Sequence, residues 1–416
     1  MADVRPFICC LPQASLAHQV AALPYDVFSR AEAAAQIAQH PLSFLRIDKS
    51  CALLPPEVDQ YHPQVYQTAS QLFTQDLQQG IYQPQPQPHY YLYRLIQNGH
   101  AQTGIVACIA VADLKANILK RHENTRHLKL EDRTQHILAL HAQTGPVFVT
   151  YPTQPQLSAT VQQTCTTTPP LFDFTTPDNV QHTAWCINDK SAEDTIRTSF
   201  LNTEGLYIAD GHHRAAAAEI ALERANNQGD NQSGEADYFL IVAFPSDEVQ
   251  ILDYNRVVFD TNGLSPQDLL ARAAECFDVT PIEGIPADGT PPKPGRKGEF
   301  ALYVDGQWYQ LVVHEGLRSA DPVEGLDVSL LHNLLLEPVL GIDDPRSSER
   351  IAYVGGSRGL IELKNRIDER ESGLAVALYP CSLEELFAVA DAGRLMPPKS
   401  TWFEPKPRSG LFIHQI

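Results

Sequence analysis

The feature that most constrains the fold is a strand, a tight turn and a helix, written in Leu206–Glu219 as LYIADGHHRAAAAE. An apolar strand runs into Asp210 and Gly211, and an alanine-rich helix begins after two histidines and an arginine. The first N–H groups of such a helix have no intrahelical partner, and the helix dipole adds partial positive charge there. Gly211 lets the backbone approach a ligand closely and Arg214 adds a charged donor, so the segment predicts a phosphate site.

The same residues have a plainer interpretation. Asp210 would then be an ordinary N-cap, and His212 and His213 would be exposed loop residues. The segment alone does not decide between these two. The histidine pair also permits a transition-metal site completed by His122 or His182, but an arginine beside a metal ion is unfavourable, so we rank this below the phosphate site.

Composition limits the classes of partner. The chain has 416 residues, enough for two or three domains, and its hydrophobic content of 43% indicates a globular protein. A formal charge of −19 opposes binding to duplex nucleic acid. The longest apolar runs are strand-sized and the N-terminus lacks a signal-peptide pattern, so we expect no membrane segment. Eight scattered cysteines without a CxxC spacing indicate free thiols in a reducing cytosol, which predicts a cytoplasmic protein.

The N-terminal region reads as helical. Ser29 and Glu32 have capping-box spacing, and the helix that they open should stop before Pro41. A second helix is expected from about Pro56 to Gln79. The polar stretch QPQPQPH that follows is a spacer and the first candidate domain boundary.

A strand-rich region comes next. Tyr90–Ile96 and Gly104–Val111 are β-prone runs joined through an Asn-Gly turn, which predicts a hairpin. Pro146–Tyr151 is expected to be a buried strand, and the Thr- and Pro-rich stretch 152–178 a long surface excursion. Ser191 would cap a short helix before the strand at Leu206.

The rest of the chain alternates without a regular βαβ order. YFLIVAF and ILDYNRVVF predict two strands, Ser265 starts a helix, and FALYVDGQWYQLVVH predicts a hairpin. Two further helices are expected around residues 326–340 and 382–392. This mixture favours an α+β fold over a doubly wound sheet.

A second informative stretch is the K-R-H-E element at Lys120–Glu123. A glutamate that follows a strand and precedes a helix can sit beside a phosphate loop and take a proton from a substrate hydroxyl. The alternative is a solvated, charged helix start in which Glu123 is a favourable N-terminal acid.

The order of these elements over Tyr90–Val258, with IADGHHR, resembles the free L-serine kinase and its ParB/sulfiredoxin-like superfamily. The resemblance implies an α+β fold with a central mixed sheet. It implies that Glu123 is a general base and that Asp210 is a second acidic residue of the active site, which orients the substrate or the network of His212 and Arg214. It also implies that the phosphate or nucleotide binds at the turn formed by Gly211, His212, His213 and Arg214.

The whole chain is identified as a member of the domain of unknown function 1015 family. The matching stretches are LPYDVFS (23–29), HPLSFLRID (40–48), KRHENTRHLKLEDR (120–133), IADGHHR (208–214), ILDYNRVV (251–258) and MPPKST (396–401). We therefore expect three parts: a helical N-terminal region (1–85), the ParB/sulfiredoxin-like catalytic domain (86–260) and an α+β C-terminal domain (261–416).

The resemblance implies a phosphotransferase that uses ADP or ATP with Mg²⁺ and acts on a small hydroxylated molecule, for which it indicates L-serine. Further substrate or phosphate contacts are expected from Lys120, His122, Arg126 and Lys399, and Lys399 has the alternative of lying on a tail strand. The alternatives are a nucleotide- or phosphometabolite-binding regulatory protein without turnover, and a metal-dependent phosphoester hydrolase. A homo-oligomer is compatible with the sequence.

Overall fold

The computed structural model describes residues 1–229, 231–287, 289–370 and 372–416. The chain forms two compact units. The first unit contains Met1–Arg121, Thr125–Val249 and Pro405–Ile416. The second contains His122–Asn124 and Gln250–Glu404.

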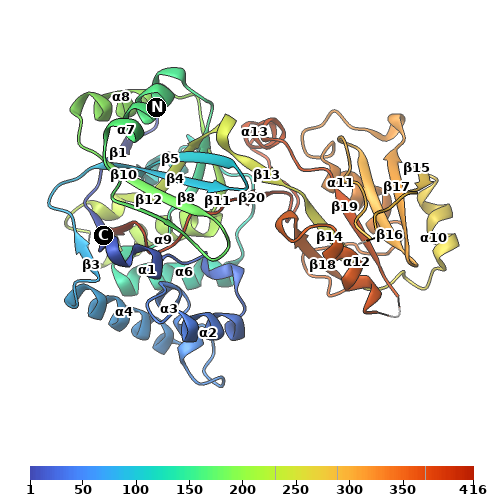
Figure 1. The fold of residues 1–416 in the computed structure, drawn as a ribbon, viewed down its shortest axis with the longest axis horizontal. Coiled ribbons are helices and arrows are strands. Elements are labelled where there is room, and N and C mark those ends of the chain that lie inside the picture. Colours follow the sequence, from blue (N-terminus) through green and yellow to red (C-terminus); the bar gives the residue numbers. More distant parts are fainter. Residues whose placement is uncertain (230, 288, 371) are drawn as a thin grey trace. The chain divides into compact units, whose positions relative to one another are not determined.

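A nine-stranded mixed sheet organises the first unit (Figure 1). Strand β11 runs parallel to β6 and β12 runs parallel to β8, whereas the other pairs are antiparallel. The strands in spatial order are β6 (Leu119–Lys120), β11 (Leu206–Asp210), β8 (Val147–Tyr151), β12 (Tyr238–Pro245), β5 (His100–Ala110), β4 (Tyr90–Gln97), β10 (Gln181–Ile187) and β9 (Phe172–Thr175), with β1 (Val4–Arg5) paired to β5.

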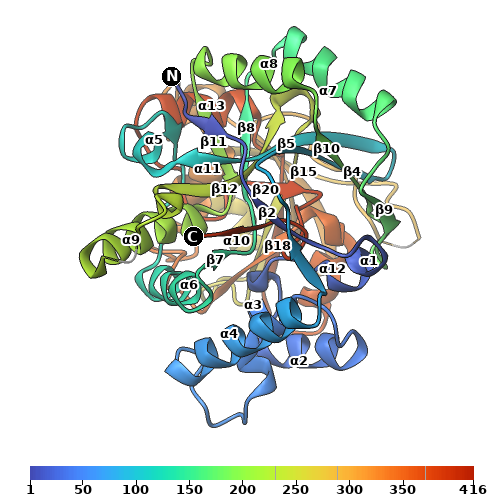
Figure 2. The ribbon, with the colours of Figure 1, turned by 90° about the vertical axis from the view of Figure 1, so that its left-hand side faces the viewer.

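Helices lie on both sides of this sheet. In Figures 1 and 2, α7 (Pro155–Thr167) and α8 (Lys190–Leu201) lie above it, and α6 (His127–Leu140) and α4 (Pro63–Gln78) lie below. Helix α9 (His212–Gln228) packs against α6. The other helices of this unit are short or peripheral: α1 (Ala17–Val20), α2 (Arg30–Gln39), α3 (Leu45–Asp48) and α5 (Val111–Lys115).

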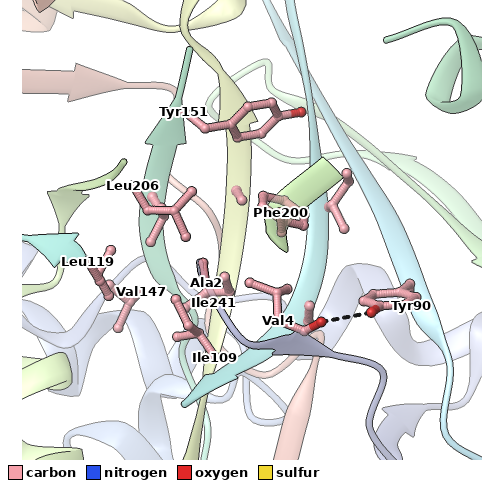
Figure 3. Close-up of a cluster of buried hydrophobic side chains, with 14 of the residues drawn as sticks. Ala2, Val4, Tyr90, Ile109, Leu119, Val147, Tyr151, Phe200, Leu206 and Ile241 are labelled. Carbon is pink, nitrogen blue, oxygen red and sulfur yellow. Dashed lines mark hydrogen bonds between the residues drawn. The ribbon is translucent and has the colours of Figure 1, made fainter. Parts of the chain in front are cut away.

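The core of the first unit follows from the two-residue period of its strands. Alternate residues of β5, Ile105, Ala107 and Ile109, are fully buried in one cluster together with Phe200 of α8. Figure 3 shows this cluster, in which the Tyr90 hydroxyl donates to the Val4 carbonyl at 2.8 Å. The cluster therefore joins the sheet to its helices and to the N-terminal strand.

The C-terminal strand of the chain belongs to a small four-stranded sheet in the first unit. Its strands in order are β3 (Tyr82–Pro84), β2 (Cys9–Pro12), β21 (Ile413–Gln415) and β7 (Ala142–Gln143). The red C-terminal segment in Figure 1 accordingly lies among elements from the first half of the chain. Because of this pairing, residues from 405 onward are packed beside residues near 145 and 210.

The second unit is built on a six-stranded antiparallel sheet. Its strands in order are β15 (Phe277–Pro281), β17 (Gln307–Val313), β16 (Glu299–Val304), β19 (Leu374–Leu378), β14 (Tyr254–Val258) and β18 (Ile351–Gly355). Strands β13 (Gln250–Leu252) and β20 (Trp402–Glu404) form a separate pair, and the helices are α10 (Pro266–Ala273), α11 (Asp327–Leu331), α12 (Ile361–Asp368) and α13 (Leu383–Asp391).

The α+β class with a large central mixed sheet is confirmed. So are the capping box that Ser29 and Glu32 form at the start of α2, and the hairpins β4–β5 and β16–β17. The described cysteines are free thiols, and no described helix is long and apolar enough to span a membrane. The division into three parts expected from the sequence stays a prediction.

Three expectations about the bounds and caps of elements were wrong, two for helices and one for a strand. Helix α4 begins at Pro63 rather than near Pro56, because the His62 side chain accepts from the Gln64 N–H and the preceding carbonyls instead bind the Arg30 guanidinium. Helix α8 is capped by Asp189 and not by Ser191. The predicted strand over ILDYNRVVF is two strands, β13 and β14, interrupted at residue 253.

The expected surface excursion at 152–178 is also wrong, because it contains α7 and β9. Pro155 stands at the helix start, where its missing N–H costs nothing. The threonine hydroxyls, which suggested a loop, bond back to carbonyls one turn earlier, as Thr160 does to Gln156 at 3.1 Å. Leu157 anchors the helix in the core.

The buried ion pair between Arg46 and Asp76 should stabilise the N-terminal helices. The side chains are 9% and 3% exposed, and Nη2 lies 2.6 Å from Oδ2. We expect Asp76→Ala to lower the free energy of unfolding by about 3–5 kcal/mol, because the guanidinium stays buried without its carboxylate. Urea denaturation measures this, with the exposed Asp194→Ala as a control expected within about 0.5 kcal/mol of the original protein. Equal losses in both variants would refute the prediction.

Candidate functional site

The turn that follows β11 presents the N-terminus of a long helix without a side-chain cap. Gly211 occupies the N-cap position with φ of +95°, and as a glycine it supplies no side-chain cap to α9. The first backbone hydrogen bond of the helix runs from the Ala215 N–H to the Gly211 carbonyl at 3.0 Å. The interpretation of Asp210 as an ordinary N-cap is therefore wrong, and the positive end of the α9 dipole lies at this glycine turn.

Glycine is required at position 211 for two reasons. A side chain rarely adopts a φ of +95°, and an added Cβ would lie 2.8 Å from Nε of Arg214. Arg214 therefore folds back over the turn, and its guanidinium occupies the space that a side chain at 211 would take.

Asp210 is held between two cations. Its Oδ2 accepts from Nη2 of Arg214 at 2.6 Å, and its Oδ1 accepts from Nζ of Lys406 at 2.7 Å. Arg214 also donates through Nη1 to the Pro146 carbonyl at 2.5 Å. Burial alone would raise the pKa of Asp210, but Lys406 and then Arg214 outweigh it and hold that pKa well below its usual range.

This triad carries one net positive charge, since Arg214 and Lys406 contribute two positive charges and Asp210 one negative charge. The charge lies at the positive end of the α9 dipole. In a chain with a formal charge of −19, such a local excess favours an anion at this turn.

The two histidines of the turn are not exposed loop residues, so that interpretation is also wrong. Both belong to α9, and His212 is 3% exposed. The Nε2 of His213 accepts the Arg126 N–H at 3.0 Å. Burial, with smaller contributions from charges such as Lys129, lowers the pKa of His213 to about 4, so its imidazole is neutral at pH 7.

The other predicted residues separate into two groups. Lys120 lies in β6 opposite Tyr207 of β11, with its Nζ 5.2 Å from the centre of that ring, and Arg126 contacts His213. His122 and Glu123 fold with the second unit, where the His122 carbonyl accepts from the Met396 N–H at 2.8 Å.

Lys399 also belongs to the second unit, where its Nζ lies 5.4 Å from the centre of the Tyr254 ring and its carbonyl accepts from Arg256 at 3.0 Å. The structure thus brings together Asp210–Arg214 with Arg126 and, one strand away, Lys120. The roles of Glu123, His122 and Lys399 stay predictions.

Sequence reasoning missed Lys406, because it lies 196 positions from Asp210 and no local pattern connects them. It also missed a cavity of about 40 Å³ that Arg214 borders. Four of the stretches that match the family contribute residues to its lining, among them Tyr25, Asp48 and Arg133, but we assigned no role to these residues from the sequence. The signal that could have indicated them was the presence of charged and aromatic side chains in stretches that match the family.

The alternative metal site that His182 would complete is not formed. Among the described residues, no group of three or more His, Cys, Asp or Glu side chains is placed to hold a metal ion. His182 is buried elsewhere in the first unit, where its Nδ1 lies 2.7 Å from the Tyr93 hydroxyl. The histidine pair at 212–213 is therefore not joined by His182 in a metal site.

Residues 4–329 match the family described as "Protein of unknown function (DUF1015)", and the chain belongs to this family. No curated protein matches the chain. Among solved structures, a free serine kinase in complex with AMP is similar at 13% identity and a TM-score of 0.34, over 73% of this chain and 90% of that one. A conserved hypothetical protein from Pyrococcus furiosus has 15% identity and a TM-score of 0.33, over 73% and 93%. C-terminally truncated SbnI from Staphylococcus aureus has 12% identity and a TM-score of 0.36, over 73% and 84%.

We expect Lys406→Met to lower the free energy of unfolding at pH 7 by roughly 1–3 kcal/mol, because Asp210 loses a charge-assisted hydrogen bond. A carboxylate with a lowered folded-state pKa stabilises the fold above its unfolded pKa of about 3.9, and this stabilisation is lost as the pH falls further. The difference between variant and original should therefore shrink on acidification below about pH 4. Lys406→Arg is the matched control, and a pH-independent difference would contradict the assignment.

We expect the imidazole of His213 to stay neutral down to about pH 5, because burial lowers its pKa to about 4. A histidine whose folded pKa lies below its unfolded value of about 6.5 destabilises the fold progressively as the pH falls between these two values. Nitrogen-detected NMR of histidine-labelled protein measures the titration, with His213→Gln identifying the signal. A midpoint near 6.5 would show that the ring is not desolvated.

Proposed function

We propose that the chain is a nucleotide-dependent phosphotransferase that moves a phosphoryl group from ADP or ATP to a small hydroxylated molecule. The observation that carries the proposal is the net positive triad of Asp210, Arg214 and Lys406 at the N-terminus of α9, where the N-cap residue is Gly211. Backbone N–H groups, a helix dipole and two cations are the donors that a phosphate requires.

The nucleotide would place its terminal phosphate against the turn from Gly211 to Arg214. The positive φ of Gly211 keeps the approach free of a Cβ, and Arg214 and Lys406 supply the charge that the transferring group needs. Asp210 orients both cations, so it acts through them and not as a base: its low pKa keeps it ionised and paired.

The donor set also fits the cofactors that the resemblance implies. Mg²⁺ binds through substrate phosphates with one or two carboxylates, so it does not need a preformed cluster of protein ligands. It would enter with the nucleotide and neutralise charge on the phosphates. The neutral His213 accepts a backbone N–H and therefore supports the shape of the turn rather than its charge.

The reaction needs a base for the acceptor hydroxyl. Glu123 stands three residues after Lys120, in the segment that leaves β6, the strand parallel to β11. Its carboxylate would take the hydroxyl proton while the hydroxyl oxygen attacks the terminal phosphorus. The bond from that phosphorus to the bridging oxygen breaks, and AMP or ADP leaves with the electron pair.

We expect purified protein with Mg²⁺, L-serine and ATP or ADP to give a growing phosphoserine resonance in phosphorus NMR. Glu123→Gln should lower the rate at least about 100-fold, the usual contribution of a positioned base, with nucleotide affinity within about twofold. Glu204→Gln, an exposed glutamate, is the matched control.

Two outcomes would count against this proposal. Nucleotide binding without transfer to L-serine or any other hydroxylated acceptor would favour the regulatory binding protein. Phosphate release with no acceptor present would favour a hydrolase.

A further inference from the structure

A cavity of about 40 Å³ lies next to the phosphate turn, entirely within the first unit. It is several times larger than the space that one water molecule requires, and it opens partly to solvent. Arg214 forms part of its wall and at the same time contacts Asp210 of the turn. A molecule in this cavity would therefore lie beside the residues that we assign to the phosphate.

The walls of the cavity combine apolar residues with buried charges. Ile137, Val147 and Phe239 contribute apolar surface, whereas Asp48 and Arg133 are 4% and 8% exposed. Burying ions is costly, and well-packed apolar residues of similar volume are often at least as stable. Stability alone therefore does not explain the buried charges of Asp48 and Arg133 in the cavity wall.

Arg133 is already neutralised. Its Nε donates to Oδ2 of Asp132 at 2.9 Å, its Nη2 lies 2.8 Å from the same oxygen, and its guanidinium stacks 3.8 Å from the centre of the Tyr25 ring. Among the neighbouring groups that raise the pKa of Arg133, Asp132 acts most strongly, ahead of Tyr25 and Asp48, and Asp132 does not line the cavity.

Asp48 has no ion-pair partner of its own that is charged at pH 7. Its Oδ1 accepts from the Thr144 hydroxyl at 2.9 Å and lies 3.8 Å from Nε2 of His136. Burial, and next the charge of Arg133, lower the pKa of His136 to about 4, so this ring brings no charge at pH 7. Arg133 is the cation that acts on Asp48: its Nη2 donates to the Asp48 carbonyl oxygen at 3.3 Å, and the Asp48 charge contributes to its raised pKa. Because Arg133 is paired with Asp132, the two carboxylates and one guanidinium leave this wall with one net negative charge. The neighbouring Lys49 instead donates to the carbonyls of Tyr25 and Phe28.

We propose that this cavity is the acceptor subsite and that Asp48 binds an ammonium group of the acceptor. The chemical class is a small amine that carries a hydroxyl group, either an amino alcohol or a hydroxy amino acid. The orientation of the acceptor rests on the proposed function, because its hydroxyl must face the phosphate at the turn. The binding of the amine by Asp48 does not depend on that function and follows from the cavity and its charges.

The test is calorimetric titration of the full chain, without nucleotide, with three probes. Ethanolamine has the ammonium and hydroxyl groups, L-serine adds a carboxylate, and glycolate has the hydroxyl and carboxylate without the amine. We expect ethanolamine, L-serine or both to bind. We expect Asp48→Asn to weaken amine binding at least tenfold, and we expect no comparable loss in the exposed control Asp194→Asn.

A second variant keeps the test decisive if Asp48→Asn does not fold. In Gly145→Ala, the added Cβ would lie 2.9 Å from Oγ of Ser409 and 3.3 Å from Nη1 of Arg214, both in residues that line the cavity. It narrows the cavity without touching Asp48, and we expect it to weaken amine binding as well. Circular dichroism establishes the fold of each variant.

The outcomes separate this inference from the proposed function. Amine binding that depends on Asp48, without phosphoryl transfer, would remove the phosphotransferase and leave the amine site. Phosphoryl transfer to an acceptor without an amine would support the phosphotransferase and remove the amine site. The inference is overturned if neither amine binds, if glycolate binds and the amines do not, or if Asp48→Asn binds the amines as tightly as the original.

Discussion

The pairing of Asp210 with Arg214 and Lys406 is the interaction on which the candidate site depends. Arg214 comes from the first turn of α9, one helical turn beyond Asp210, whereas Lys406 comes from the segment that returns at the end of the chain. The same guanidinium also binds the carbonyl of Pro146 at the entrance to β8. One carboxylate therefore fixes the end of β11, the start of α9 and the C-terminal segment relative to one another. It leaves the local charge positive because two cations share it.

The C-terminal segment is held beside the turn by contacts that it makes elsewhere in the first unit. Strand β21 pairs with both β2 and β7, and Arg408 is buried with its Nη2 2.5 Å from Oδ2 of Asp178. These contacts set the path of residues 405–416 before Lys406 reaches Asp210. The small sheet thus contributes to the site on the large sheet. Its pairing places Lys406 at the end of β11 and Ser409 in the wall of the cavity.

Sequence reasoning succeeded where the determinant was local. The strand, Gly211 and α9 are encoded within Leu206–Glu219, and the capping box at Ser29 is encoded in four residues. It failed at α7, because threonine hydroxyls that compete with a helix in isolation can also bond to the carbonyls within one. Lys406 and Asp48 could not have been assigned from spacing, since tertiary pairing alone brings them to the turn and the cavity. The family-like stretches indicated which segments mattered but not which side chains meet.

The division of charge in the first unit has a consequence for how such a site would respond to pH. Two buried histidines, His213 beside the turn and His136 beside the cavity, are held neutral, each with a pKa of about 4. A third, His212, is buried in the turn itself, and its charge helps to hold the pKa of Asp210 low. The arginine, lysine and aspartate charges of the two clusters do not titrate near neutrality. The charge of the cavity wall is therefore constant between about pH 5 and pH 9. At the turn, pH dependence of catalysis can enter through His212, as well as through the base, the nucleotide and the acceptor amine.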